Sequence, residues 1–476
     1  MIDKFLRWLR ANVRVAFRKP PAPSPLARKI SKVVKILLTV CLCAFATWRI
    51  ILCIEINDRF TSIRAAGFPA SGAELNTWRP PVPDAENGAL VLAQAFSLAR
   101  TFPDGRSNQV TESRLLDRAN EWTAETRVLI AEYVQTNTAA VAKAREAFRF
   151  LRFRYPADFS YGPETELPHL GYLKAFSRIV ALRGSLEAEE KRANEWPQHV
   201  ELLLKLTATL DDEPTLISHL VRDSIMRMAV KATERSLSRA GPAAEVCDKL
   251  QKAFSAAGQT NLLAQALIGE RALMIPTFRL SWSEIQSFRD RPDEGDQPRK
   301  PQRYAGKPTP ILWLSGIFER DLNFFLETMD KSIAVAAFPP PESLGLADHF
   351  GHATQIAERR LYFLSVMYFP ALLRIAAKEA ATQAHLDLAR TALAIERFRH
   401  AKSVLPGGLD ELTPQFLEAV PRDPFDGAPL RYHRLAKGYL IYSIDSDGRD
   451  DGGREPPDRK KTTDKNSYDI TFIVGR

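Results

Sequence analysis

The sequence feature that most constrains this chain is an apolar run at Val33–Ile54, VVKILLTVCLCAFATWRIILCI. A helix needs about 20 apolar residues to cross the hydrocarbon core of a bilayer, and this run has that length. Its two basic residues, Lys35 and Arg49, lie near its ends, where long side chains can reach the membrane surface. The run predicts a transmembrane helix at residues 33–56. A buried core helix is the alternative. It is disfavoured because no other segment of the chain is as apolar over this length.

Basic residues are concentrated before this run. Residues 1–35 contain ten Lys or Arg and one acid, Asp3, so they carry +9, which equals the formal net charge of the whole chain. The positive-inside rule therefore predicts that residues 1–32 form a basic cytoplasmic tail of an inner-membrane protein, with the body outside the cytoplasm. Because the remaining sequence is balanced in charge, the net charge does not indicate a nucleic-acid surface.

A cleaved signal peptide is the competing hypothesis for the apolar run. Its basic region would be unusually long, and the residues after Ile54 offer no clear small-x-small cleavage site. We therefore expect an uncleaved signal anchor. Residues 1–18 also place apolar side chains at helical spacing between arginines, which predicts either a helix on the inner leaflet or a disordered basic tail.

Cysteine usage indicates a body held together by packing. Three of the four cysteines lie in the apolar run, which leaves Cys247 alone in the remainder of the chain. A single cysteine there cannot form an internal disulfide, and the sequence has no CxxC pair. We expect Cys247 to be a small core residue.

Residues 57–380 are predicted to form an irregular array of helices. Leu203, Leu206 and Leu210 give the three-to-four spacing of a buried stripe, and proline and aspartate mark the breaks. Asp84 is predicted to cap a helix that ends near Arg100. No fixed repeat period is visible, although helical hairpins similar to tetratricopeptide repeats remain an alternative. The polar, proline-rich stretch at residues 289–310 predicts a long loop, and Pro370 predicts a kink or break in a later helix.

The last part of the chain, residues 381–476, changes character. A helix is followed by VPRDPFDGAPLRY, YSIDSDGRDDGG and YDITF, with predicted strands at 429–433, 438–444 and 468–474. This pattern resembles the soluble part of the type II secretion major pseudopilins over about a fifth of the chain. The resemblance implies a small α+β module with antiparallel strands. Pro80–Asn87 forms a PPxPxxEN-like entry to the body. With this entry, one membrane helix and the same tail, the whole chain also resembles a group of uncharacterised bacterial envelope proteins.

The resemblance to pseudopilins implies a calcium site in the acidic loop. Matched position by position, the implied carboxylates are Asp447 and Asp469, with backbone carbonyls near Ile444 and Arg449. Calcium needs several oxygen ligands, and the loop offers three further carboxylates beside its glycines: Asp445, Asp450 and Asp451. A solvated acidic turn is the alternative. The loop is longer and more basic than in pseudopilins, and the prepilin-peptidase motif is missing, so we do not expect pilus polymerisation.

The sequence contains no catalytic signature. GxSxG, HExxH, a strand-linked GxGxxG and a complete P-loop are all missing. His349 and His352 could form a metal pair, but a surface helix start is the simpler interpretation. The arginines and phenylalanines of residues 149–154 are better explained as a helix end than as a nucleic-acid patch. A further set could line a groove between helices or form a buried ion-pair network: His219, Arg222, Glu270 and Arg271.

These observations predict a mainly α protein with an N-terminal transmembrane helix, an irregular helical array and a small C-terminal α+β module. We expect a structural or interaction protein that is anchored in the membrane, with a protein partner in the envelope and a link to a secretion-like or envelope assembly. The alternative is an envelope enzyme with a site in the helical body under the 289–310 loop. Catalysis is the less favoured of the two.

Overall fold

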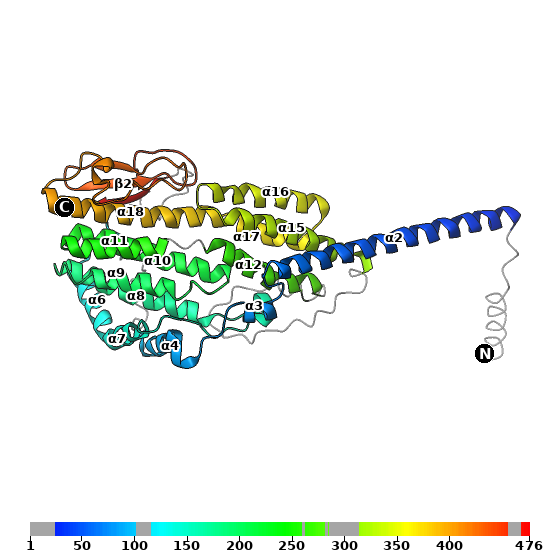
Figure 1. The fold of residues 1–476 in the computed structure, drawn as a ribbon, viewed down its shortest axis with the longest axis horizontal. Helices are drawn as coiled ribbons and strands as arrows, with labels where there is room; N and C mark the ends of the chain where they lie inside the picture. The colour runs from blue at the N-terminus through cyan, green and yellow to red at the C-terminus, as the bar shows by residue number, and fades with distance from the viewer. Residues whose placement is uncertain (1–23, 101–115, 259–261, 281–283, 285–313, 456–467) are drawn as a thin grey trace, which may run out of the picture. The chain divides into compact units, whose positions relative to one another are not determined.

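The computed structural model describes residues 24–100, 116–258, 262–280, 284, 314–455 and 468–476. These residues are mainly helical and include one small sheet (Figure 1). The chain divides into two compact units, Met1–Asp58 and Arg59–Arg476. The tail helix expected at residues 1–18 and the 289–310 loop lie outside the described residues.

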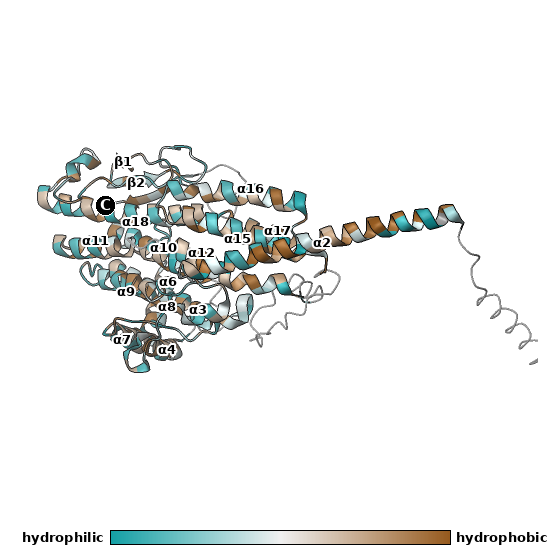
Figure 2. Ribbon diagram, turned by 45° about the vertical axis from the view of Figure 1, so that its right-hand side comes forward, coloured by the Kyte–Doolittle hydropathy of each residue, from teal (hydrophilic) through white to brown (hydrophobic). Residues whose placement is uncertain are grey.

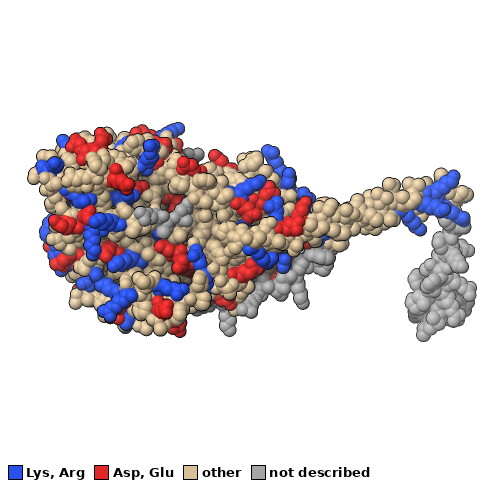
Figure 3. All heavy atoms as spheres, viewed as in Figure 1, with Lys and Arg blue, Asp and Glu red and all other residues tan. Residues whose placement is uncertain are grey.

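The apolar run lies in α2, which extends from Pro25 to Ala65. Arg28–Ala65 is the one helix among the described residues that is long and apolar enough to cross a membrane. Most of its large apolar side chains up to Ile54 are exposed, with 62% exposure at Leu38 and 60% at Ile50, whereas a core helix would bury them. Membrane anchors and signal sequences both have these properties. Figure 2 shows the apolar stretch in brown, and Figure 3 shows basic side chains at the N-terminal end of α2.

After the end of α2, the second unit continues with two short helices whose caps are well defined. Ser71 caps α3 (Gly72–Trp78) by accepting the Glu74 N–H at 3.2 Å. Asp84 does not cap the next helix, as the sequence predicted, because Asp84–Glu86 form a single 3-10 turn, η1. Asn87 caps α4 (Gly88–Leu98) instead, with its side-chain oxygen accepting the Ala89 N–H at 3.1 Å.

The cause of this difference is a long-range contact. The Asn87 side chain accepts the backbone N–H of Arg154 at 2.9 Å and donates to the Arg154 carbonyl at 2.8 Å. These bonds fix Asn87 at the start of α4 from a segment 67 residues further along the chain. Local sequence therefore could not decide which polar residue caps the helix.

A layered group of helices forms the centre of the second unit (Figure 1). The elements are α6 (Ala124–Thr136), α7 (Thr138–Ala147), η3 (Phe159–Glu164), α8 (Pro168–Glu189), α9 (Pro197–Ala208), α10 (Leu216–Arg239), α11 (Ala244–Gly258), α12 (Leu263–Met274) and η4 (Ile275–Arg279). Helix α10 packs against α8, α9 and α12. Thr215 caps its start, because the Thr215 hydroxyl accepts the Ser218 N–H. Cys247 on α11 is fully buried, as expected of a core residue.

One break among the later helices falls at a place that the sequence did not mark. The elements are α15 (Ile317–Ala336), η5 (Glu342–Leu344), α16 (Gly345–Arg360), α17 (Phe363–Leu372) and α18 (Ile375–Lys402). Pro370 lies inside α17, so the helix does not break at the proline itself but ends two residues later, at Leu372. Leu361, at a φ of 58°, ends α16. The buried Asp321 then accepts the N–H groups of Leu364 and Ser365, which starts α17 from another helix.

The C-terminal strands form an antiparallel sheet in the order β1-β2-β3, which confirms the predicted arrangement. The elements are η6 (Leu409–Leu412), β1 (Arg431–Arg434), β2 (Tyr439–Ser443) and β3 (Ile470–Val474). In this register Ser443 pairs with Ile470, so the chain leaves β2 beside the point where β3 begins. The relationship to pseudopilins stays a prediction.

The sheet is part of the same compact unit as the helices. Helix α18 packs against β2 and β3, and also against α10 and α11. The Ile473 N–H on β3 donates to Glu234 on α10 at 2.7 Å, and Arg476 pairs with Glu396 on α18. The predicted boundary between residues 380 and 381 thus falls inside α18, which contributes to both the helical core and the sheet.

Candidate functional site

The loop at the end of β2 is organised by Asp423, a carboxylate that sequence reasoning did not single out. Asp423 is fully buried. Its oxygens accept hydrogen bonds from the Phe425 and Ile444 N–H groups and from the Ser443 hydroxyl, all at 2.8–3.0 Å. Arg431 also pairs with it. Asp423 therefore connects the DPFDG segment to the end of β2, and the only sequence signal was its place in that motif.

Three of the predicted calcium ligands lie in the exposed loop after β2 and accept hydrogen bonds from nearby backbone. Asp445 accepts the Ser446 N–H at 2.6 Å and Asp447 accepts the Arg449 N–H at 3.0 Å. Asp450 accepts the Gly452 N–H at 2.9 Å. This hydrogen bond lowers the pKa of Asp450. Such contacts order an acidic turn, but they leave further lone pairs for a cation.

Asp469 differs from these loop carboxylates because it is buried, with 5% of its surface exposed. Its Oδ2 accepts the Gly453 N–H at 2.7 Å. Among the described residues its Oδ1 has no hydrogen-bond partner. Burial raises the pKa of Asp469, and the charges of Asp450 and Asp451 add to the rise. The structure thus places the loop beside a buried carboxylate oxygen that a cation could satisfy.

A second cluster of possible ligands lies between α10 and α18. It consists of His219, Asp223 and Glu379, whose ligand atoms all lie within 4.8 Å of one another. His219 Nε2 is 2.6 Å from a Glu379 oxygen and 3.8 Å from Asp223 Oδ2. His219 and Asp223 are four residues apart on α10, so they share one face of that helix. The loop carboxylates form no comparably tight group within the described residues.

Burial and nearby charges shift the pKa values of His219 and Asp223. Burial lowers the pKa of His219, but the hydrogen bond to Glu379 and the charge of Asp223 outweigh it, so the pKa lies above its usual value. Burial, together with the Glu379 charge, raises the pKa of Asp223 to about 7. Two carboxylates close to one histidine therefore compete for a single proton or cation.

The predicted set that contained His219 divides between different contacts. Arg222 donates to Asp211 at 2.7 Å and to the Ala257 carbonyl at 3.1 Å. Arg271 pairs with Asp330 on α15. Burial raises the pKa of Glu270 to about 7, while a hydrogen bond from the Leu216 backbone opposes the rise. The arginines therefore form ion pairs, and His219 belongs to the cluster with Asp223 and Glu379.

The other proposed metal pair is placed differently. His349 and His352 lie on α16, and His349 Nε2 is 3.3 Å from the Thr328 carbonyl oxygen. Neither histidine belongs to the ligand group found in the described part of the chain. The surface-helix interpretation agrees with this arrangement.

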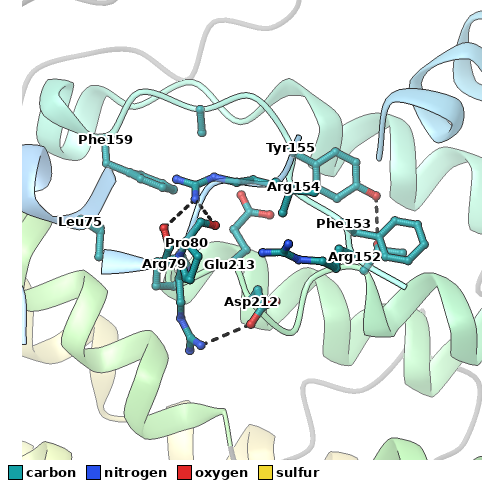
Figure 4. Close-up of a pocket in the computed structure, with 14 residues that line it drawn as sticks. Leu75, Arg79, Pro80, Arg152, Phe153, Arg154, Tyr155, Phe159, Asp212 and Glu213 are labelled. Atoms are coloured by element: carbon teal, nitrogen blue, oxygen red, sulfur yellow. Dashed lines mark hydrogen bonds and ion pairs between the residues drawn. The ribbon is translucent and has the colours of Figure 1, made fainter. Parts of the chain in front are cut away.

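A small pocket lies between the extended segment after α3 and the turn before α10 (Figure 4). Its volume is about 100 Å³, below the roughly 300–1,000 Å³ of typical ligand sites. Arg154 points its guanidinium at the backbone and donates to the carbonyls of Asn76, Arg79 and Pro80 at 2.6–2.9 Å. Arg79 pairs with Asp212 at 3.3 Å. These arginines therefore hold the extended segment in place.

Comparisons of the chain with models of protein families, with curated proteins and with solved structures found no match.

Sequence reasoning identified one member of the α10–α18 cluster and missed two. The spacing of His219 and Asp223 was a usable signal, because residues four apart lie on one helix face. Glu379 lies 160 residues after His219, and no local pattern connects them. The packing of α18 on α10 brings them together.

Proposed function

We propose that this chain is a single-span inner-membrane protein whose helical body acts outside the cytoplasm as a structural or interaction component of an envelope assembly. The observation that carries the proposal is α2. Its apolar side chains are exposed along a length sufficient to cross a bilayer, and the helix continues without a break to Ala65. Lipid is the environment in which such a helix is stable.

Charge supports the proposed orientation. The basic excess of residues 1–35 equals the net charge of the chain. In the body, Figure 3 shows acidic and basic side chains interspersed on the visible face. A basic segment before the span favours a cytoplasmic N-terminus, and a mixed-charge body gives no sign of nucleic-acid binding.

We also propose that the C-terminal module is pseudopilin-like and binds calcium. Support comes from the long helix α18 followed by an antiparallel sheet, and from the Asp423 contacts within the DPFDG motif. The buried Oδ1 of Asp469 lies next to a loop rich in carboxylates and would gain a partner in calcium. Asp447 and Asp469 would be ligands, with Asp445, Asp450 and Asp451 nearby.

An interaction role is favoured over catalysis by the small size of the described pocket and by the engagement of its arginines with backbone. Exposed apolar side chains offer contact sites, with 80% exposure at Leu361 between α16 and α17 and 42% at Ile317 at the start of α15. The two positions lie in neighbouring segments, because Arg320, near Ile317, donates to the hydroxyl of Tyr362, next to Leu361, at 3.4 Å. An enzyme site in the body is the alternative, and the cluster of His219 with two carboxylates is the observation that favours it.

The test is carried out in bacterial membranes with the full chain, in a background where Cys41, Cys43 and Cys53 are alanine. Ser24→Cys lies before the span, and Val404→Cys lies exposed in the second unit. A membrane-impermeant maleimide added to intact spheroplasts should label Val404→Cys and leave Ser24→Cys unlabelled until lysis. Labelling in the reverse order would contradict the orientation. Release of the chain by carbonate would contradict the anchor.

The interaction role is tested by photo-crosslinking from position 361 in the same membranes, with position 404 as the exposed control. A discrete protein adduct at 361 that Ile317→Asp abolishes, and that 404 does not give, is the expected result. A chain that crosslinks to no protein from either position would count against an interaction role.

A further inference from the structure

The α10–α18 cluster contains a buried carboxylate that receives no hydrogen bond from the described protein atoms. Asp223 exposes 1% of its surface. Neither of its carboxylate oxygens has a hydrogen-bond partner within the described ranges, and the same is true of His219 Nδ1. A buried carboxylate left in this state is strongly destabilising, so the site calls for a proton or a cation.

The charges of the neighbouring Arg222 and Arg227 lower the pKa of Asp223, but the hydrogen bonds of these arginines go to other groups. The Arg222 guanidinium donates to Asp211 and to the Ala257 carbonyl. Arg227, one turn beyond Asp223, donates to the Thr382 hydroxyl at 2.9 Å. These contacts direct hydrogen bonds of both arginines to other groups, whereas Asp223 and Glu379 face His219. Two carboxylate charges in this position match the charge of one divalent ion.

We propose that His219, Asp223 and Glu379 bind a divalent first-row transition-metal ion between α10 and α18. One imidazole nitrogen and two carboxylate oxygens suit ions such as Zn²⁺ or Mn²⁺, whereas calcium prefers six to eight oxygens. His219 Nε2 is the ligand nitrogen because it is the ring atom that faces both carboxylates.

The three ligand side chains would need to move only slightly to bind a metal ion. Bond lengths of about 2.0–2.2 Å in a tetrahedral zinc site place neighbouring ligand atoms roughly 3.4 Å apart. The His219–Glu379 and His219–Asp223 separations of 2.6 and 3.8 Å lie on either side of that value. Glu379 is part-exposed, with 18% of its side chain accessible, which gives the ion a path from solvent.

The bound ion would join two helices that pack against each other. Helices α10 and α18 both contact β3, and α18 also contacts β2 and α11. The site is thus a structural link between them. It is independent of the proposed membrane topology and of the calcium loop, and it uses none of their residues.

The test uses the full chain in detergent, purified without a histidine tag, stripped with chelator and dialysed. Zn²⁺ is titrated calorimetrically, and thermal unfolding is followed with and without Zn²⁺. The variants are Asp223→Asn and Glu379→Gln, and the matched control is His349→Gln on α16. Asp223→Asn keeps the shape of the side chain and removes the buried charge, so it should fold. Glu379→Gln is a second, independent removal of a ligand.

The expected result is one Zn²⁺ per chain, with binding weakened at least tenfold in both ligand variants and unchanged in His349→Gln. Zn²⁺ should raise the unfolding midpoint of the wild type and of the control, but not of Asp223→Asn. Equal binding by all variants would show adventitious surface metal and overturn the proposal. Absence of binding, with stability that rises as the pH falls, would show that a shared proton occupies the site and would also overturn it.

Discussion

Two buried aspartates in different regions of the second unit show how differently a charge can be accommodated. Asp423, in the C-terminal module, is fully buried and accepts hydrogen bonds from two backbone N–H groups and the Ser443 hydroxyl, and it pairs with Arg431. Asp223, on α10, is 1% exposed, and neither oxygen finds a donor in the described structure.

The difference separates a structural carboxylate from a ligand-binding one. Donors that surround Asp423 replace the water lost on burial, so its charge supports the fold. Asp223 lost the same water without replacement and lies beside a second carboxylate, Glu379. Residue type and burial are the same in both cases, and the number of donors decides which role is available.

The largest loss of stability is expected from Asp423→Ala. Removing this carboxylate leaves two buried N–H groups, a hydroxyl and Arg431 without their acceptor. Loss of one partner from a buried charged network typically costs about 3–5 kcal/mol. Denaturant unfolding of the full chain in detergent should show a loss of that size.

The control for this change is Asp426→Ala, which removes a partner of Arg431 that is more exposed than Asp423. Its cost should stay below about 1 kcal/mol, as is usual for exposed pairs. Equal losses in the two variants would mean that Asp423 is no more important than a surface carboxylate.

The second-largest effect is expected in the pH dependence of the free energy of unfolding, to which Asp223 contributes. Its pKa is about 7 in the folded protein, against about 3.9 for an unfolded aspartate. Between these values the folded state holds a proton that the unfolded state has lost, so metal-free stability should rise as the pH falls from 8 to 5. The raised pKa of His219 acts in the same direction.

Asp223→Asn should reduce this rise by roughly 2 kcal/mol, because each pKa unit is worth about 1.4 kcal/mol and the site is shared with His219 and Glu379. Unfolding curves at pH 5 and pH 8 in chelator measure the effect. Parallel profiles for the variant and the wild type would show that Asp223 does not titrate in this range.

The smallest effect is expected in the acidic loop. With calcium at ten times its dissociation constant, a folded-state site adds about 1.4 kcal/mol of stability. Asp447→Ala should remove this calcium-dependent increase, whereas Asp410→Ala, an exposed acid outside the loop, should keep it. An unfolding midpoint that is the same in calcium and in chelator would leave the loop as a solvated acidic turn.

The sequence predicted the parts of this structure that depend on local signals. The buried Cys247 and the positions of the strands followed from neighbouring residues, whereas the antiparallel arrangement was implied by the resemblance to pseudopilins. The start of α4 and the break before α17 did not follow from neighbouring residues, because Asn87 is held by Arg154 and the first turn of α17 is held by Asp321.

The candidate sites also show that local sequence signals do not reveal contacts between distant segments. Acidic residues that are dense in the sequence, as in the loop after β2, were easy to find. The α10–α18 cluster combines a visible helical pair, His219 and Asp223, with Glu379 from a distant helix. Whether a buried carboxylate is compensated depends on donors from distant segments, which a sequence pattern does not contain.

One measurement tests the comparison most directly: the free energies of unfolding of Asp423→Asn and Asp223→Asn, each against the wild type, at pH 8 in chelator. Asparagine keeps the shape of both side chains and removes the charge. Opposite signs are expected, with Asp423→Asn destabilised by about 2 kcal/mol or more and Asp223→Asn equal to or more stable than the wild type. Comparable destabilisation by both variants would contradict the account, because it would show that Asp223 is as well compensated as Asp423.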